Sequence, residues 1–186
     1  MRHPSRLHGA AVSLRLASAY DADRIVEIRS TPEVYSRWAG NDLRAEFLGD
    51  VASDDLTLLV IQDKHGQVIG GIQWDEESDP MYRHAGLDLY IDPAFHGRGY
   101  GTDAVATLVA YLIDVVGHLR LVIDPAADNA AAIACYSKVG FKPVGLMRRY
   151  ERAVDGSFHD GLLMDLLAEE FIRRQLPPPS PNGASV

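Results

Sequence analysis

The feature that most constrains this chain is the run at residues 87–102, which joins a strand pattern to a glycine-rich loop and a helix start. Apolar residues mark one face of the strand at period two: Leu87, Leu89 and Ile91. Pro93 ends the strand, and glycine then recurs at alternate positions: Gly97, Gly99 and Gly101. A helix is predicted over residues 104–113, and its first turn offers unpaired N–H groups and a positive dipole end. The run therefore predicts a binding site for a phosphate or pyrophosphate group.

The common nucleotide-binding loops do not explain this run. A Walker A loop needs a Lys-Ser/Thr pair after its last glycine, where this chain has Thr102 and Asp103. The dinucleotide fingerprint needs G-x-G-x-x-G, and the spacing here is G-x-G-x-G. A strand-to-helix connection without any ligand is the remaining alternative, and a second motif downstream argues against it.

The loop resembles the acyl-CoA loop of the GNAT acetyltransferase superfamily. The superfamily pattern is Gln/Arg-x-x-Gly-x-Gly/Ala, and this chain has His-Gly-Arg-Gly-Tyr-Gly at residues 96–101. The resemblance implies that acetyl-CoA is the cosubstrate and lies across the loop, with its carbonyl polarised by a backbone N–H of residues 90–92. It implies these cofactor-binding residues: Tyr90, Ile91, Asp92, His96, Gly97, Arg98, Gly99, Tyr100, Gly101, Thr102, Asn129 and Ala132.

The second motif lies at residues 128–141 and resembles the superfamily segment Asn-x-x-Ala…Tyr-x-x-x-Gly-Phe. Asn129 stands near the predicted helix start, and Tyr136 lies seven residues later on the same helical face. The resemblance implies that Asn129 bonds the pantetheine arm and that Tyr136 sits near the thioester sulfur. When an amine attacks a thioester, the leaving thiolate needs a proton, which a nearby phenol can donate as a general acid. The alternative for Tyr136 is a core position with its hydroxyl at the edge.

Asp88 is the other candidate catalytic residue. On the alternating strand, Asp88 and Tyr90 face away from the apolar side. A carboxylate on a central strand should line a cleft, because a dry core would leave its charge unpaired. The acceptor amine arrives as an ammonium ion, so a carboxylate there could hold it and accept its proton, directly or through water. The alternative is an edge strand on which Asp88 faces solvent.

An acidic segment, Trp-Asp-Glu-Glu-Ser-Asp-Pro at residues 74–80, indicates a cationic acceptor. Carboxylates beside an indole suit a polycation, although most acidic loops are merely solvated. This segment, Gly-Leu-Asp at residues 86–88 and Trp-Ala-Gly at residues 38–40 resemble aminoglycoside 6′-N-acetyltransferases, and the likeness covers most of residues 33–171. It implies these substrate-binding residues: Trp38, Trp74, Asp75, Glu76, Asp79 and Asp88. The last predicted hairpin, residues 148–160, is longer and more basic than in that subfamily, which leaves the acceptor open.

Composition restricts the classes of partner that the chain could bind. A net charge of −8 argues against nucleic acid or an anionic membrane and agrees with a cationic small molecule. The single cysteine, Cys135, excludes an intramolecular disulfide and indicates a reducing, cytoplasmic setting. The longest apolar run, residues 104–116, falls short of the ~20 residues of a membrane-spanning helix. Histidines without metal-ligand spacing predict no metal site, and we expect a monomer or a homodimer.

The element pattern predicts one α/β domain at residues 12–172, between a flexible N-terminus at residues 1–11 and a disordered Pro-rich tail at residues 173–186. Strands are predicted at residues 12–18, 56–62, 68–74, 87–91, 119–123, 141–150 and 158–166. Helices are predicted near residues 25–28, 43–51, 104–113 and 129–139, with Pro32 ending the first. We expect a mixed, largely antiparallel central sheet with helices on both faces, as in the GNAT superfamily.

Together these features predict an acetyl-CoA-dependent N-acetyltransferase that transfers the acetyl group directly in a ternary complex. The first acceptor implied by the resemblance is the 6′-amine of an aminoglycoside, and with it a role in antibiotic resistance. A polyamine, a siderophore precursor or a protein N-terminus is the alternative acceptor. A non-catalytic acyl-CoA-binding sensor is the alternative outside enzymes, and the presence of both Asp88 and Tyr136 counts against it.

Overall fold

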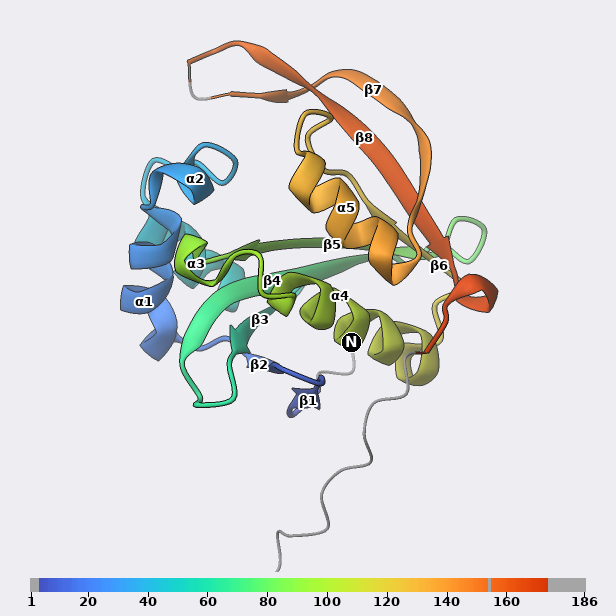
Figure 1. Ribbon diagram of the computed structural model, residues 1–186, viewed down its shortest axis with the longest axis horizontal. Helices are drawn as coiled ribbons and strands as arrows, with labels where there is room; N and C mark the ends of the chain where they lie inside the picture. Colours follow the sequence, from blue (N-terminus) through green and yellow to red (C-terminus); the bar gives the residue numbers. More distant parts are fainter. Residues whose placement is uncertain (1–3, 154, 174–186) are drawn as a thin grey trace, which may run out of the picture.

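A single sheet runs through the centre of the computed structural model, which describes residues 4–153 and 155–173 (Figure 1). Its strands are β1 Leu7–His8, β2 Ser13–Leu16, β3 Leu56–Gln62, β4 Val68–Glu77, β5 His84–Ile91, β6 Arg120–Ile123, β7 Lys142–Arg152 and β8 Phe158–Leu167. They lie in the order β1-β2-β3-β4-β5-β6-β8-β7, and neighbours are antiparallel except for β5 and β6. The predicted mixed, largely antiparallel sheet is confirmed.

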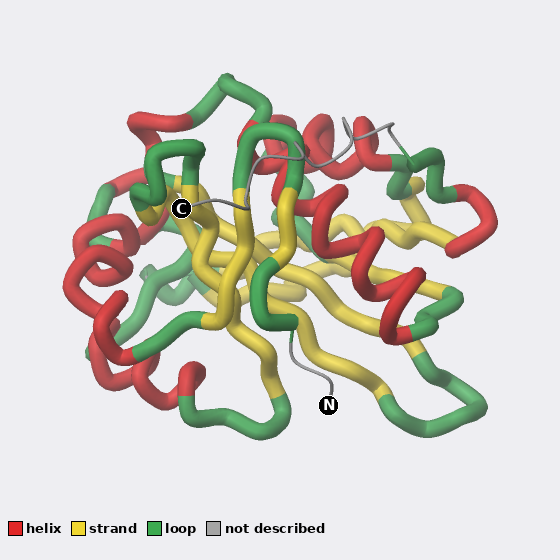
Figure 2. Tube along the Cα trace, turned by 90° about the horizontal axis from the view of Figure 1, so that it is seen from below, coloured by secondary structure: helices red, strands yellow, loops and turns green. Residues whose placement is uncertain are grey.

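Helices cover both faces of this sheet (Figure 2). They are α1 Ala22–Arg29, α2 Pro32–Tyr35, α3 Leu43–Val51, α4 Tyr100–Tyr111 and α5 Ala130–Val139, with a π-helical turn η3 Leu112–Val116 after α4 and 3-10 turns η1 Ala19–Asp21, η2 Pro93–Phe95 and η4 Ala168–Glu170. Two hydrophobic cores result. Residues of α1, α2 and α3 pack against Leu58 and Val60 on one face, whereas residues of α4 and α5 pack against Leu59 and Leu121 on the other.

Strand β5 divides its side chains between the two cores, as its period predicts. Leu87 is buried in the α4 core, and Leu89 and Ile91 pack against the same core. Tyr90 belongs to the opposite core. Asp88 shares the face of Tyr90, because side chains alternate along the strand. Since β5 lies between β4 and β6, Asp88 stands on an inner strand of the sheet, two residues beyond the last pair with β6.

The sheet opens between β5 and β6. Their parallel pairing is limited to Ala85 with Leu121 and Gly86 with Val122. Beyond these pairs, β6 continues beside β8 while β5 stays paired with β4 as far as Ile91. The second half of β5 therefore turns its edge toward a gap.

Among the helix and strand bounds that differ from the sequence predictions, those of α1 and β4 change the interpretation most. Helix α1 ends at Arg29, and Pro32 begins α2 instead of ending α1. Proline is favoured there because the first turn of a helix leaves its N–H groups unpaired. Strand β4 runs to Glu77, so residues 75–77 of the acidic segment belong to a strand and not to a loop.

The N-terminal segment also differs from the prediction of a loose terminus. Strand β1 pairs with β2, and the backbone amides of Ala10, Ala11 and Val12 donate to the carboxylate of Asp103 in the first turn of α4. Residues 1–3 and residues 174–186, which include most of the predicted tail, lie outside the described residues.

Candidate active site

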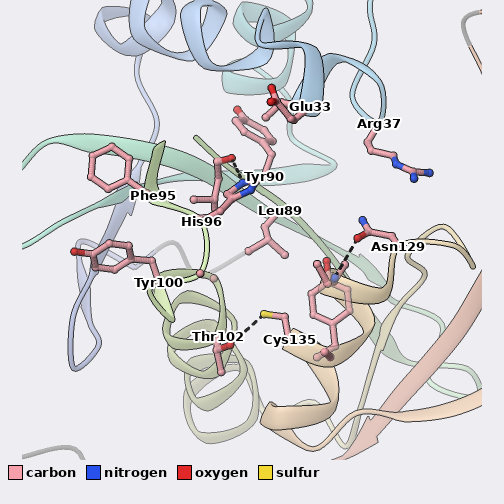
Figure 3. Close-up of a pocket in the computed structure, with 18 of the residues that line it drawn as sticks. Glu33, Arg37, Leu89, Tyr90, Phe95, His96, Tyr100, Thr102, Asn129 and Cys135 are labelled. Carbon is pink, nitrogen blue, oxygen red and sulfur yellow. Dashed lines mark hydrogen bonds between the residues drawn. The ribbon is translucent and has the colours of Figure 1, made fainter. Parts of the chain in front are cut away.

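A cavity of about 470 Å³ lies where the free edge of β5 meets the loop after it, the start of α4, and α5 (Figure 3). Its lining includes twelve of the predicted residues: Trp38, Tyr90, Ile91, His96, Gly97, Gly99, Tyr100, Gly101, Thr102, Asn129, Ala132 and Tyr136. The fold thus brings together two motifs that α4 and β6 separate in the sequence.

The glycine loop offers a backbone surface that suits an anion. Gly97 and Gly99 have φ angles of +72° and +82°, which residues with a Cβ adopt only at an energetic cost. A Cβ added at either glycine would meet no atom within 4 Å, so the backbone angle requires glycine there and the space beside it is open. Gly99 is the N-cap of α4, and the amides of the first helical turn follow it. This arrangement fits a pyrophosphate group.

The edge of β5 offers backbone groups to the same cavity. The amide of Asp92 donates to the Ile69 carbonyl oxygen of β4 at 2.8 Å. Because hydrogen-bonding direction alternates along a strand, Leu89 and Ile91 direct their peptide groups the other way, into the gap. The Leu89 amide is bonded to Asp88 Oδ1 at 2.8 Å, and the Ile91 carbonyl oxygen lies 2.8 Å from Nε2 of His96. The Ile91 amide therefore points to where a bound carbonyl could be polarised.

Helix α5 closes the opposite side of the cavity. Its N-cap is Asn129, whose Oδ1 accepts a hydrogen bond from the Ala132 amide at 3.1 Å. The Thr102 hydroxyl and Cys135 Sγ lie 3.3 Å apart, so α4 and α5 contact each other where they border the cavity (Figure 3). Burial raises the pKa of Cys135, which keeps its thiol protonated and agrees with a packing role.

Asp88 and Tyr136 lie close enough for the charge of one to affect the other. Burial raises the pKa of Asp88 to about 7, and the charges of Asp124 and Glu151 add to this effect. Tyr136 is 4% exposed, and burial, followed by the charge of Asp88, raises its pKa well above its ordinary value. One group thus titrates near neutral pH and the other stays protonated, which are the states that a general base and a general acid need.

Further polar groups surround Asp88 that the sequence did not point to. Asp124 directly follows β6, and the Tyr150 hydroxyl of β7 donates a hydrogen bond to its carboxylate. Glu151 is the next residue of β7, and its charge raises the pKa of Asp88. The position of Asp124 after a buried strand was a usable signal, because strand ends often carry binding residues. No local pattern marked Tyr150 or Glu151.

The acidic segment contributes less than predicted. Trp74 is fully buried in the α4 core beside His118, so it has no surface with which to form an acceptor-site wall. Glu76 is bound to Arg83 at 2.9 Å, and Asp79 is an exposed residue. Asp75 and Glu77 lie on the Asp88 face, where Asp75 stands opposite Gly86 and Glu77 opposite His84. The reason is the alternation of β4, which continues through residues 75–77 and sends successive side chains to opposite faces.

Two predicted cofactor-binding residues have other contacts. The Asp92 carboxylate accepts a hydrogen bond from the Ala94 amide at 2.9 Å and pairs with Arg24. Arg98 is exposed and places its guanidinium 5.4 Å from the ring centroid of Phe95. Both side chains stabilise or border the loop and lie outside the cavity lining.

A mixed sheet that opens beside a glycine-rich helix start is the arrangement expected of an acyl-CoA-dependent transferase. The family model described as "Acetyltransferase (GNAT) domain" matches residues 12–142, and the chain belongs to this family. Membership supports acetyl-CoA as the cosubstrate.

Individual relatives differ in their acceptors. Aminoglycoside N(6′)-acetyltransferase type 1 of Klebsiella pneumoniae is 29% identical over 154 residues, which are 73% of this chain and 76% of the relative. Spermidine N(1)-acetyltransferase of Escherichia coli is 24% identical over 102 residues, 55% of this chain and 54% of the relative. The structure of Mycobacterium smegmatis RimJ in complex with CoA-disulfide superposes with a TM-score of 0.79 at 22% identity, covering 92% of this chain and 93% of that one, and shows the same fold.

Residues 4–153 and 155–173 also bear on metal binding and membrane insertion. Within them, no three His, Cys, Asp or Glu side chains are grouped so that they could hold a metal ion. No helix in this part of the chain is both long enough and apolar enough to span a bilayer.

Proposed function

We propose that this protein acetylates a primary amine of a polycationic small molecule, with the 6′-amine of an aminoglycoside as the first acceptor to test. The observation that carries the proposal is that Asp88, whose pKa is about 7, lies close enough for its charge to act on Tyr136, which lines the cavity and is held protonated. Similarity to aminoglycoside N(6′)-acetyltransferase type 1 supports the choice of acceptor.

Acetyl-CoA would be bound mainly through the backbone. The amides at Gly99 and in the first turn of α4 suit its pyrophosphate, and the Ile91 amide suits the acyl carbonyl oxygen. Asn129 uses its Oδ1 to cap α5, so its NH₂ group is the part that would reach the pantetheine arm.

Proton transfers at Asp88 and Tyr136 accompany the transfer of the acetyl group. Asp88 accepts a proton from the ammonium group of the acceptor, directly or through one water. The amine nitrogen then forms a bond to the acyl carbon, the carbon–sulfur bond breaks, and Tyr136 gives its proton to the departing thiolate. The proton that nitrogen loses as the amide forms returns to Tyr136, and Asp88 releases its proton to solvent. The products are the amide, free CoA thiol and one proton.

The surroundings of Asp88 favour a cationic acceptor. Asp75, Asp124 and Glu151 lie around it, and the charges of Asp124 and Glu151 are felt at its carboxyl. Trp38 adds an aromatic surface at the cavity, with its ring centroid 4.8 Å from that of Tyr90. An ammonium ion gains both from the carboxylates and from an aromatic face.

The test is release of free thiol from acetyl-CoA in the presence of kanamycin, spermidine or a short peptide. Asp88→Asn and Tyr136→Phe should each reduce kcat with kanamycin by about 10²-fold or more, because each removes one proton-transfer group. Asp55→Asn, which removes an exposed carboxylate far along the chain from both motifs, is the matched control and should behave like wild type.

Three other outcomes of this assay would change the assignment. Turnover of spermidine or peptide alone would retain the chemistry and replace the acceptor. Binding of CoA without acetylation of any of these amines would overturn the enzyme assignment in favour of an acyl-CoA sensor. Full activity of Tyr136→Phe would overturn its role as the acid.

A polyamine is the second candidate acceptor. The same carboxylates would bind its ammonium groups, and the similarity to spermidine N(1)-acetyltransferase supports it. The ratio of kcat/KM for kanamycin to that for spermidine decides between the two.

A further inference from the structure

Strand β7 carries a bulge shortly before the tip of its hairpin with β8. The register shifts between Met147 and Glu151, so that residues 148–150 stand opposite Asp160 alone. In the bulge, Arg149 has a φ angle of +53°, and its amide donates to Asp160 Oδ1 at 2.7 Å. Arg149 is the one non-glycine residue with a positive φ in the described part of the chain. Bulges near active sites commonly redirect a side chain, and an unfavourable φ persists only where surrounding contacts hold it.

The side chain that follows this turn is Tyr150. Its ring lies over Gly161 of β8, where an added Cβ would come within 2.8 Å of the Tyr150 Cδ1 atom. Strand β8 separates β7 from β6, so the ring crosses β8 before its hydroxyl reaches Asp124 at the end of β6. Tyr150 nevertheless remains 53% exposed, so the phenol borders open space and not the core.

The phenol is neutral and has hydrogen-bonding capacity left. Its hydrogen bond to Asp124, followed by burial and by the charges of Asp124, Asp88 and Asp75, raises the pKa of Tyr150 to about 12. Because its single proton is donated to Asp124, the oxygen can only accept from any third partner. A hydroxyl that donates to a carboxylate is polarised by it and becomes a stronger acceptor, so an N–H of a cation suits this position.

We propose that Tyr150 is a specificity-determining residue that, with Asp124, binds a second ammonium group of the acceptor while Asp88 binds the reacting one. The inference rests on the proposed function and adds a requirement to it, namely that good acceptors carry at least two cationic groups. The bulge at Arg149 and the missing side chain at Gly161 together let the phenol reach this position. A monoamine has no group to place there and gains nothing from Tyr150.

The test compares acceptors that share a reacting amine and differ in the second one. Kanamycin is paired with 6-amino-6-deoxyglucose, and spermidine is paired with n-butylamine. Tyr150→Phe should lower kcat/KM for kanamycin or spermidine about tenfold, mainly through KM, which is the scale of one hydrogen bond to a charged group. It should change kcat/KM for the monoamines and KM for acetyl-CoA less than twofold. Tyr20→Phe, which alters a side chain that is 99% exposed, is the matched control.

A second variant tests the position of the Tyr150 ring without changing Tyr150 itself. Gly161→Ala should push the ring away from Asp124 and give the same selective loss as Tyr150→Phe, and the two changes combined should add little to either alone. An equal loss for monoamines and polyamines, or no loss for either, would overturn the inference and leave the acetyltransferase assignment intact, provided that wild type turns over. If wild type acetylates none of the four amines, the proposed function fails and this inference fails with it.

Discussion

Replacing Asp88 by asparagine should remove most of the activity and stabilise the protein above neutral pH. The pKa of Asp88 is about 7 instead of its ordinary value of 3.8, chiefly because of burial. The difference is about three pH units, and each unit is worth about 1.4 kcal/mol, so the ionised carboxylate costs the folded state about 4 kcal/mol relative to a neutral side chain.

The sign follows from the direction of the change. A carboxyl whose pKa is raised by folding contributes its full stability below the unfolded value, about pH 4, and loses it as the pH rises through about 7. Asparagine has a similar shape and remains neutral, so the variant does not lose stability in this way. The free energy of unfolding of wild type, relative to Asp88→Asn, should therefore fall by about 2.5 kcal/mol between pH 5 and pH 8.

Urea unfolding of both proteins at pH 5 and pH 8 measures this difference. The exposed Asp55→Asn control should follow wild type at both values. In kinetic assays, kcat/KM of wild type should rise as Asp88 loses its proton near pH 7, and the variant should lack this rise. Parallel unfolding free energies for wild type and Asp88→Asn across the range would refute the burial argument, even if activity were lost.

Three further changes test the loop, the N-terminal segment and the core. Gly99→Ala should raise KM for acetyl-CoA severalfold in steady-state kinetics and leave KM for the acceptor near wild type, because its φ of +82° costs a residue with a Cβ about 1–2 kcal/mol. Asp103→Ala should lower the free energy of unfolding by about 2 kcal/mol in urea titrations, since it frees the amides of residues 10–12. Trp74→Ala should destabilise the fold by about 3–5 kcal/mol, whereas Trp74→Phe should keep KM for the acceptor within twofold of wild type, as expected of a buried side chain.

The parts of the fold that sequence predicted well depend on local rules. Alternation along residues 87–91 identified both faces of β5, and these faces decide that Asp88 and Leu89 point in opposite directions. Asn129 at the N-cap and Gly140 at the C-cap, with a φ of +121°, delimit α5 as predicted. These signals need only neighbours in the chain, so one sequence is enough to read them.

The acidic segment at residues 74–80 shows where local sequence rules fail to predict the structure. Residues 74–80 were predicted to be an acidic loop, yet β4 continues to Glu77 because β5 pairs with its residues 70–77. Once the strand continues, Trp74 and Glu76 must share one face and Asp75 the other. The extent of β4 depends on a partner strand, and that information is not present in the segment itself.

The positions of Asp124 and Tyr150 likewise depend on partner strands and not on their own segments. For this reason the acceptor is harder to predict from the sequence than the reaction. The proposed reaction uses the β5 edge and the two motifs beside it, which local patterns mark. The surroundings of Asp88 depend on a strand order in which β8 lies between β6 and β7, and on a bulge that points Tyr150 across β8. A register shift of one residue in β7 would send that side chain to the other face. On the proposed role of Tyr150, a change of hairpin register alone would alter acceptor preference, with Asp88 and Tyr136 left in place.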